Sequence, residues 1–562
     1  MLYSFTEKHK NFLYSIAIFL CVFIPLSILS SNWGFDIDDC GVILGSRFIN
    51  LQSFINLFKI SDQYGLYLPS NYSAPQHNFI GSMSGFYRPI TLVFFGIQYT
   101  LFGAWPYGYV LIMIFFHALN AALLFNLFLF FISYFWAIWG ALFFAYHISL
   151  WGWMSWIAAQ PYTTSLNFLI LATILFFYSL KKNKIAYLLL SCSLYAIAVF
   201  LFEFTIVFPL FITSCFLIYD FLRKPLQLPT YLGKSFFSFF KKTIFLWSVT
   251  IFFLIARFMA CIKNNNQTSL TVSTSINNLI FSLKTRTADL ISFLVDICNI
   301  SFIPSGNQIL KGSLVLLVLS LLLFLFYKNK QKKIIIFFFV STILFLWPAI
   351  LKHYTLRYFY FSLPLYIFMI LLLFKNTDYA HHIKLKKITT LIALVILGGN
   401  IFFVSSRLKT RGLFLKDKAD VISELLAHKN INSGPLCFIG IPRSTFSTAL
   451  AQQLWMCGLN ESQPIYFDLS LFARTQATNE KNHLKIEQIE NGFKLKSLDP
   501  QKLWWDSWGG GEMPMGNKTV HKTDKNTGHI YEISIVLDKK HLNKKLIFIT
   551  WDYVKNKFMI LD

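Results

Sequence analysis

The stretch FLYSIAIFLCVFIPLSIL, residues 12–29, decides the fold class, because it is an unbroken apolar run long enough to cross a lipid bilayer. Lys8 and Lys10 precede it, and no small-residue cleavage site follows. It is therefore expected to stay in the protein as a first transmembrane helix and not to be removed as a signal peptide. Similar runs recur as far as Ser405. The sequence predicts an α-helical polytopic membrane protein.

The composition supports the same class. Of 562 residues, 55% are hydrophobic, only 14% are charged and 63 are Phe, whereas about a quarter of a soluble domain is charged. An outer-membrane barrel is excluded because its strands alternate apolar and polar residues. The net charge of +24 would suggest nucleic acid binding in a soluble protein. Here the excess lies in short loops between apolar runs, so it indicates membrane topology, and no nucleic acid partner is predicted.

The basic loops set the predicted topology. By the positive-inside rule the N-terminus is cytoplasmic, and the four basic loops must share its side. These loops are 181–184, 223–242, 328–333 and 375–387. Eleven spans satisfy the rule: 11–31, 106–132, 134–148, 162–180, 185–202, 204–222, 243–262, 312–327, 334–350, 358–374 and 388–404. An odd count places the C-terminal segment outside, together with loops 32–105, 149–161, 263–311 and 351–357. We expect a multi-pass protein of the plasma (inner) membrane.

The first outer loop, 32–105, carries helical signals of its own. Residues 42–60 place apolar side chains at helical spacing, as in a helix that lies in the membrane interface. Residues 88–102 form a second apolar stretch. Counting it as a crossing would put the basic loops on the wrong side, so it is predicted to be a re-entrant or skimming helix.

The last segment changes character after about residue 405. It is richer in polar residues and contains short β-type runs between turns, one turn being Glu490-Asn491-Gly492. The β-type runs are Leu436–Ile441, Ile465–Leu469, Ile530–Leu537 and Leu546–Trp551. We expect a transmembrane domain at 1–405 and a soluble, extracytoplasmic α+β domain at 406–562.

The eight cysteines show no CxxC motif, so neither a zinc site nor a redox motif is predicted. Cys437 and Cys457 both fall in the predicted outer domain. They either pair in an oxidising compartment or stay as buried free thiols.

Three acids follow the first span within four residues: Asp36, Asp38 and Asp39. One interpretation is structural, with Asp36 capping the next helix and the other two complementing its dipole. The other is functional, because one acid is enough for a cap and three neighbouring carboxylates repel one another unless a cation or a substrate offsets them.

Further ionisable residues map to the same membrane face. Arg88 begins the skimming helix, Glu203 follows the fifth span and Arg357 begins the tenth. Arg88 is either a site residue or an interfacial arginine whose charge reaches the headgroups. His117 lies inside an apolar run, where a histidine more often bonds to a neighbouring helix than takes part in catalysis. The convergence of acids and arginines from distant segments is the strongest functional signal.

Several short motifs together resemble a known family. They are the pair Asp38-Asp39, YRPITL (87–92), LFG (101–103), HALNAALL (117–124), FAYH (144–147), WIA (156–158), Glu203 and RYFY (357–360). Their order and spacing resemble the bacterial relatives of protein O-mannosyltransferases, and are similar to the transmembrane-and-tetratricopeptide O-mannosyltransferases. The resemblance covers about residues 30–400 and implies a fold of the GT-C glycosyltransferase superfamily.

The resemblance implies a membrane glycosyltransferase that moves a sugar from a polyprenyl-phosphate-linked donor to an acceptor hydroxyl at the outer face, with inversion. It implies catalytic roles for Asp39 and Asp38. Arg88 and Arg357 would bind the donor phosphate, and the site would be lined by Asp36, Tyr87, His117 and Glu203.

Departures from the family pattern leave the sugar and the acceptor (protein, lipid or polysaccharide) open. Ala159-Gln160-Pro161 stands where the family has Arg-x-Asp, Phe202 replaces a lysine, and tetratricopeptide repeats are missing. A divalent metal also stays open, because two aspartates are too few ligands to argue for one.

Two other functions compete with this prediction. A transporter or flippase would have inverted repeats and broken helices with ionisable residues near the bilayer midplane, and the sequence shows neither. An O-antigen ligase or polymerase would centre on a late outer loop rich in Arg and His, but loop 263–311 contains no His.

Overall fold

A computed structural model describes part of the chain. The described residues are 2–36, 39–47, 50–58, 87–148, 154, 156–213, 243–259, 320, 335, 359–375, 383–428, 431–432, 434, 436–438, 453–459, 465–467, 471–475, 484–489, 492–497, 503–507, 518–523, 530–536, 547–552 and 557–561.

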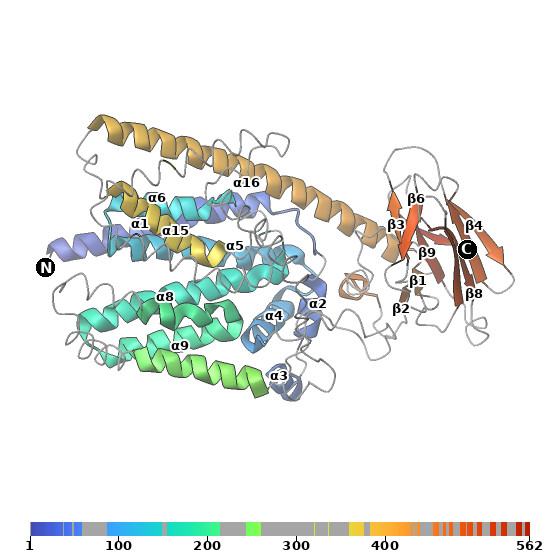
Figure 1. Ribbon diagram of the computed structural model, residues 1–562, viewed down its shortest axis with the longest axis horizontal. Helices are drawn as coiled ribbons and strands as arrows, with labels where there is room; N and C mark the ends of the chain where they lie inside the picture. Colours follow the sequence, from blue (N-terminus) through green and yellow to red (C-terminus); the bar gives the residue numbers. More distant parts are fainter. Residues whose placement is uncertain are drawn as a thin grey trace, which may run out of the picture.

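The first part of the chain is a bundle of helices (Figure 1). Its labelled helices are α1 (Leu2–Leu29), α2 (Asp39–Gly45), α3 (Leu51–Leu57), α4 (Pro89–Phe102), α5 (Pro106–Leu129), α6 (Tyr134–Ala145), η3 (Ile157–Ala159), α8 (Gln160–Lys182), α9 (Ile185–Leu201), η4 (Glu203–Val207), α15 (Phe359–Lys375) and α16 (Ile383–Leu426). Helical structure also continues from η4 to Thr213 and covers Thr243–Met259, within the expected span 243–262. Three described helices are long and apolar enough to cross a membrane: His9–Leu29, Pro106–Leu129 and Ile157–Lys182.

Most predicted spans within the described ranges coincide with helices. The expected spans 106–132, 185–202 and 358–374 correspond to α5, α9 and α15. The expected spans 312–327 and 334–350 lie outside the described residues apart from Ser320 and Ile335. The count of eleven crossings therefore stays a prediction.

Polar side chains fix how the first helices pair. Near one end, the Tyr107 hydroxyl of α5 donates to the backbone oxygen of Ser27 in α1 at 3.0 Å. Near the other, Asn126 Nδ2 donates to Ser15 Oγ at 2.8 Å. Because the residue numbers run in opposite directions along the two helices, α1 and α5 are antiparallel neighbours.

The first outer loop differs from its prediction. One interface helix was expected over 42–60, but two short helices are present, α2 and α3. Cys40 and Ile43 of α2 are fully buried, so α2 packs inside the protein and does not lie on its surface. In α3, by contrast, Leu51 is 73% exposed. The helix predicted over 88–102 is present as α4, with Pro89 in its first turn.

The C-terminal part contains two sheets. Its strands are β1 (Leu436–Phe438), β2 (Ile465–Phe467), β3 (Leu471–Thr475), β4 (Leu484–Ile489), β5 (Gly492–Ser497), β6 (Leu503–Ser507), β7 (Lys518–Thr523), β8 (Ile530–Val536), β9 (Ile547–Asp552) and β10 (Lys557–Leu561). Four of them, β1, β2, β8 and β9, coincide with the strands predicted from the sequence. The expected turn at 490–492 joins β4 to β5, whose register pairs Ile489 with Gly492.

The two sheets have different topologies. The order of the first is β10-β9-β1-β2, with β1 parallel to both neighbours and β10 antiparallel to β9. The second contains β3 to β8 and is antiparallel. Because all its strands fall between β2 and β9 in sequence, the antiparallel sheet is an insertion into the first sheet.

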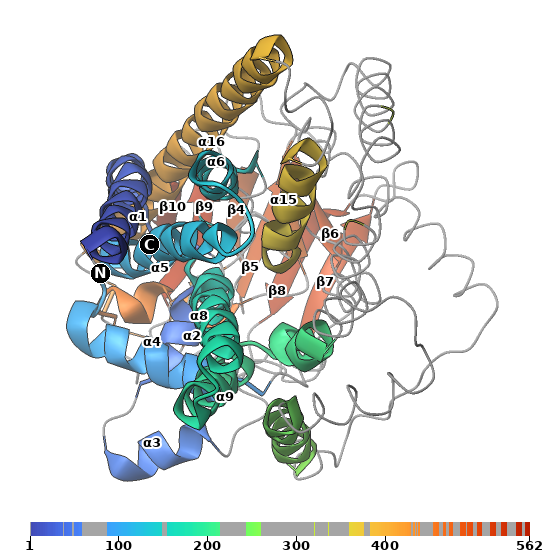
Figure 2. The same cartoon turned by 90° about the vertical axis from the view of Figure 1, so that its left-hand side faces the viewer.

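Helix α16 connects the bundle to the sheets. The N-terminus lies at one end of the bundle and the sheets lie beyond the other, and α16 runs between them (Figure 1). Figure 2 looks along the bundle from the N-terminal end, with the sheets behind the helices. The boundary expected at 405/406 falls inside α16, which is one continuous helix of 44 residues.

Candidate functional site

Asp39 is anchored by backbone groups at the end of the bundle that faces the sheets, called the sheet-facing end below. It begins α2 and its side chain is 0% exposed. Its Oδ2 accepts the backbone N–H of Asp36 at 2.7 Å, and its Oδ1 accepts the backbone N–H of Ala158 at 2.8 Å. Ala158 belongs to η3, which leads into α8. The Asp39 carboxylate therefore fastens the start of α2 to the start of α8.

The side chain of Asp36 contacts α16. Its carboxylate forms an ion pair with Arg411, 375 residues away in the sequence. Gln453 Nε2 lies 3.2 Å from the backbone oxygen of Phe35 and 3.4 Å from that of Asp36, and donates to both. The loop after α1 is thus held by α16 and by the helical turn at 453–456.

The loop passes very close to α16 around Gly34. A Cβ placed on Gly34 would lie only 2.8 Å from the backbone oxygen of Leu415. The neighbouring Trp33 donates its indole N–H to the backbone oxygen of Leu408 at 3.3 Å. A residue without a side chain is needed here, because any larger one would push the loop off the helix.

Lys418 adds a second positive charge from α16. Burial lowers its pKa from the ordinary value of 10.5, while the nearby charges of Asp36, Cys40 and Asp39 oppose the decrease. Burial and the neighbouring Asp39 raise the pKa of the Cys40 thiol. Asp36, Asp39, Arg411 and Lys418 together form what we call the loop cluster, with two acids on the loop side and two bases on α16.

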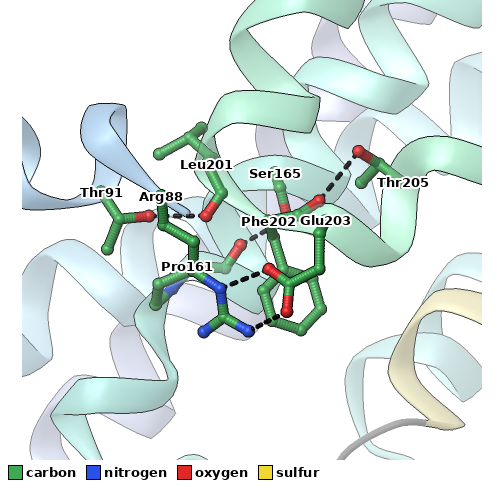
Figure 3. A network of polar contacts seen from close by, with 8 residues as sticks. All are labelled: Arg88, Thr91, Pro161, Ser165, Leu201, Phe202, Glu203 and Thr205. Atoms are coloured by element: carbon green, nitrogen blue, oxygen red, sulfur yellow. Dashed lines mark hydrogen bonds and ion pairs between the residues drawn. The ribbon is translucent and has the colours of Figure 1, made fainter. Parts of the chain in front are cut away.

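A second charged pair lies at the same end of the bundle. Arg88 Nε and Nη2 donate to the two carboxylate oxygens of Glu203 at 2.5 and 2.6 Å (Figure 3). The side chains are only 8% and 12% exposed. The guanidinium carbon lies 4.4 Å from the centre of the Phe202 ring. The edge of Arg88 that was expected to meet a phosphate faces Glu203 in this structure.

Nearby contacts hold that pair in place. Thr91 Oγ1, one turn into α4, donates to the backbone oxygen of Leu201 at 2.6 Å (Figure 3). Tyr87 donates its hydroxyl to the backbone oxygen of Phe58 at 3.2 Å. These bonds join the start of α4 to the end of α9 and to the residue that follows α3.

His117 lies deeper in the bundle. Its Nδ1 is 2.9 Å from the Tyr360 hydroxyl and its Nε2 is 3.1 Å from the backbone oxygen of Ala145. Asn120 Nδ2 donates to the same hydroxyl at 3.0 Å and to the backbone oxygen of Thr163 at 2.8 Å. This histidine joins helices, and the network connects α5, α6, α8 and α15. Its expected place in the lining of the site stays a prediction.

Some of the predicted site residues lie outside the described part of the chain. Asp38 and Arg357 are not among the described residues. Cys457 is a free thiol, and the side chain of its suggested partner Cys437 is not described. Among the described residues, no three His, Cys, Asp or Glu side chains gather closely enough to hold a metal ion.

Sequence reasoning missed the bases on α16. Their signal is a basic run after the last predicted span: Arg407, Lys409, Arg411, Lys416 and Lys418. Such a run on the predicted outer side departs from the positive-inside rule. That departure marks these residues as candidates for a role other than topology.

No family model matches the chain, and no curated protein matches it.

Proposed function

We propose that this protein is a GT-C-type membrane glycosyltransferase that moves a sugar from a polyprenyl-phosphate-linked donor to an acceptor hydroxyl. The observation that carries the proposal is the position of the loop cluster. Asp36 forms an ion pair with Arg411, and the charges of Asp36 and Asp39 act on Lys418, at the sheet-facing end of an apolar bundle. Burying charged groups is costly unless they are paired, so a buried cluster of acids and bases is a candidate functional site.

The reaction needs a base for the acceptor hydroxyl, and we assign this role to Asp39. The acceptor oxygen attacks the anomeric carbon, the bond to the phosphate oxygen breaks, and the hydroxyl proton passes to the carboxylate. The lipid phosphate leaves with the bonding electrons, so inversion needs no covalent enzyme intermediate. Two backbone N–H groups orient Asp39, and a carboxylate oxygen is the group that would take up the hydroxyl proton.

The leaving phosphate needs cations. Arg88 and Arg357 are the family-based candidates, but a phosphate reaches the bidentate edge of Arg88 only by sharing it with Glu203 or displacing it. Arg411 pairs with Asp36 through one guanidinium nitrogen and its side chain is 35% exposed, so its charge is less completely neutralised. We therefore add Arg411 and Lys418 as phosphate-binding candidates.

The proposed location is the plasma (inner) membrane, with the N-terminus cytoplasmic and the sheets outside as a soluble domain. The basic loops and the placement of N-terminus and sheets at opposite ends of the bundle support this orientation (Figure 1). A reporter fused after Asp562 is expected to be active only if it is of a type that works outside the cytoplasm. Activity of a cytoplasmic reporter there would contradict the eleven-span count.

A transfer assay tests the function. Purified full-length protein in nanodiscs would be incubated with a panel of radiolabelled polyprenyl-phosphate sugars and protein, lipid and polysaccharide acceptors. The proposal predicts movement of label from at least one donor to one acceptor class. The proposal is contradicted if the folded protein neither binds nor consumes any of these donors.

A further inference from the structure

Two buried glutamines meet where α4 crosses the start of α8. Gln98 is 3% exposed and Gln160 is 0% exposed. Gln98 Nε2 donates to Gln160 Oε1 at 3.1 Å and to the backbone oxygen of Phe94 at 3.3 Å. Within the described part of the chain, Gln98 Oε1 and Gln160 Nε2 have no hydrogen-bond partner. Each such buried atom costs about 1–3 kcal/mol, so a partner from outside the chain is expected.

The orientation of the two amides does not change this conclusion. Amide oxygen and nitrogen positions are assigned from the hydrogen-bond pattern. If both amides were turned over, Gln160 would donate to Gln98, and Gln98 would lose its bond to Phe94. In either arrangement the pair leaves one acceptor and one donor unused, so the missing partner must both donate and accept.

A hydroxyl group has these properties. The unused atoms are no more than about 7.5 Å apart, because the oxygen and nitrogen of one amide are separated by about 2.2 Å. One hydroxyl joins atoms up to about 5.6 Å apart, and neighbouring hydroxyls of a sugar ring cover the rest of the range. Both side chains are neutral, so neither a phosphate nor a metal ion is favoured.

The glutamine pair lies beside the proposed base. Gln160 is two residues after Ala158, whose N–H holds Asp39. One turn further along α8, the backbone oxygen of Thr163 accepts from Asn120, whose own Oδ1 is buried and has no partner among the described residues. The buried atoms without partners thus follow the start of α8 from the residues next to Ala158 to Thr163. A hydroxylated ligand bound to them would lie near Asp39, the proposed base.

We infer that Gln98 and Gln160 bind hydroxyls of the glycosyl group that the donor carries. The identity of the donor rests on the proposed function, but hydroxyl recognition rests on the amide pair itself. The rival occupant is an ordered water that serves only to satisfy the two amides.

Binding measurements separate these occupants. Full-length protein in nanodiscs would be titrated with undecaprenyl phosphate, with its mannosyl and glucosyl forms, and with methyl glycosides of the same sugars. The variants are Gln98→Met and Gln160→Met, which keep the side-chain length. Asn126→Leu is the matched control, because this partly buried amide joins α5 to α1 away from the site.

We expect each glutamine variant to bind the preferred sugar-linked lipid about tenfold more weakly, with binding of the sugar-free lipid changed less than about twofold. The control should retain wild-type selectivity. Unchanged sugar selectivity in both variants, with or without a lower melting temperature, would overturn the inference and leave a structural water.

The methyl glycosides distinguish the two proposals. If the wild type binds a glycoside and both glutamine variants lose that binding, hydroxyl recognition stands even where no lipid donor is consumed, and only the proposed function fails. If the wild type binds no glycoside and does not distinguish sugar-linked from sugar-free lipid, the inference itself is overturned.

Discussion

Two ion pairs at the sheet-facing end of the bundle differ in burial and in hydrogen bonding. We call Arg88–Glu203, which is buried and joined by two hydrogen bonds, the closed pair, and Asp36–Arg411, which is partly exposed, the open pair. Arg88 and Glu203 share two hydrogen bonds, are almost fully buried and pack on Phe202. Asp36 and Arg411 are joined through one guanidinium nitrogen, and the Arg411 side chain is 35% exposed. The first pair has little capacity to accept a substrate charge without breaking. In the second pair, the partly exposed Arg411 can bind a phosphate in place of Asp36 or beside it. A site for a lipid phosphate requires such a cation.

The closed pair should give the largest effect on stability. Glu203→Gln leaves the Arg88 guanidinium buried without its carboxylate, and such a loss costs about 3–5 kcal/mol. Thermal unfolding in detergent would measure it. The double variant Arg88→Met/Glu203→Met should recover most of the loss, and Asp420→Asn on the exposed side of α16 is the control. An unfolding temperature of Glu203→Gln equal to that of wild type would show that the pair is not closed.

The open pair should matter more for donor binding. Lys418→Met combined with Arg411→Gln is expected to lower affinity for a polyprenyl phosphate about tenfold or more, because charge-assisted bonds to phosphate are lost. The double Arg88→Met/Glu203→Met variant should lower it less, since Glu203 already neutralises Arg88. Equilibrium binding in nanodiscs decides between them. The reverse order would return the phosphate to Arg88, as the family resemblance implies.

The coupling within the open pair should be small. A double-mutant cycle of Asp36→Asn and Arg411→Gln is expected to give less than about 1 kcal/mol, because Arg411 is partly solvated. The free energy of unfolding of the four proteins provides the value. A coupling of several kcal/mol would mean that this pair, too, is structural.

The pH dependence of stability tests Lys418, and the opposing charges make it the smallest effect. Because burial lowers its pKa in the folded protein, the unfolded chain binds more protons at this lysine between that pKa and 10.5, so the contribution of Lys418 to stability should rise with pH in this window. The raised pKa of Cys40 gives an opposite trend above 9.0, so the rise is measured as the difference between wild type and Lys418→Met. Asp36, Asp39, Cys40 and Arg411 are the charged or titratable groups that face it. Lys418→Met should remove the rise. An equal rise in Lys418→Met would exclude this lysine as its source.

Local sequence patterns predicted the helices and strands better than they predicted which of these elements, and which side chains, contact one another. Apolar runs located the helices, and the Asn-Gly turn at 490–492 located a hairpin. The spacing over 42–60 showed an apolar helical face but not whether it meets lipid or protein, so the burial of α2 was missed. The pairs Arg88–Glu203 and Asp36–Arg411 join residues 115 and 375 positions apart. No local pattern specifies such distant pairs.

The central claim is that Asp39 acts as the base of a glycosyl transfer. Its most direct test compares single-turnover transfer from a radiolabelled polyprenyl-phosphate sugar by wild type, Asp39→Asn and Asp38→Asn, with donor affinity measured on the same samples. We predict that Asp39→Asn lowers the rate by about 10²–10⁴ while donor affinity and folding are retained, and that Asp38→Asn has a smaller effect. Wild-type rates in both variants would contradict the claim and leave Asp39 with only the backbone-anchoring role that its two hydrogen bonds already give it.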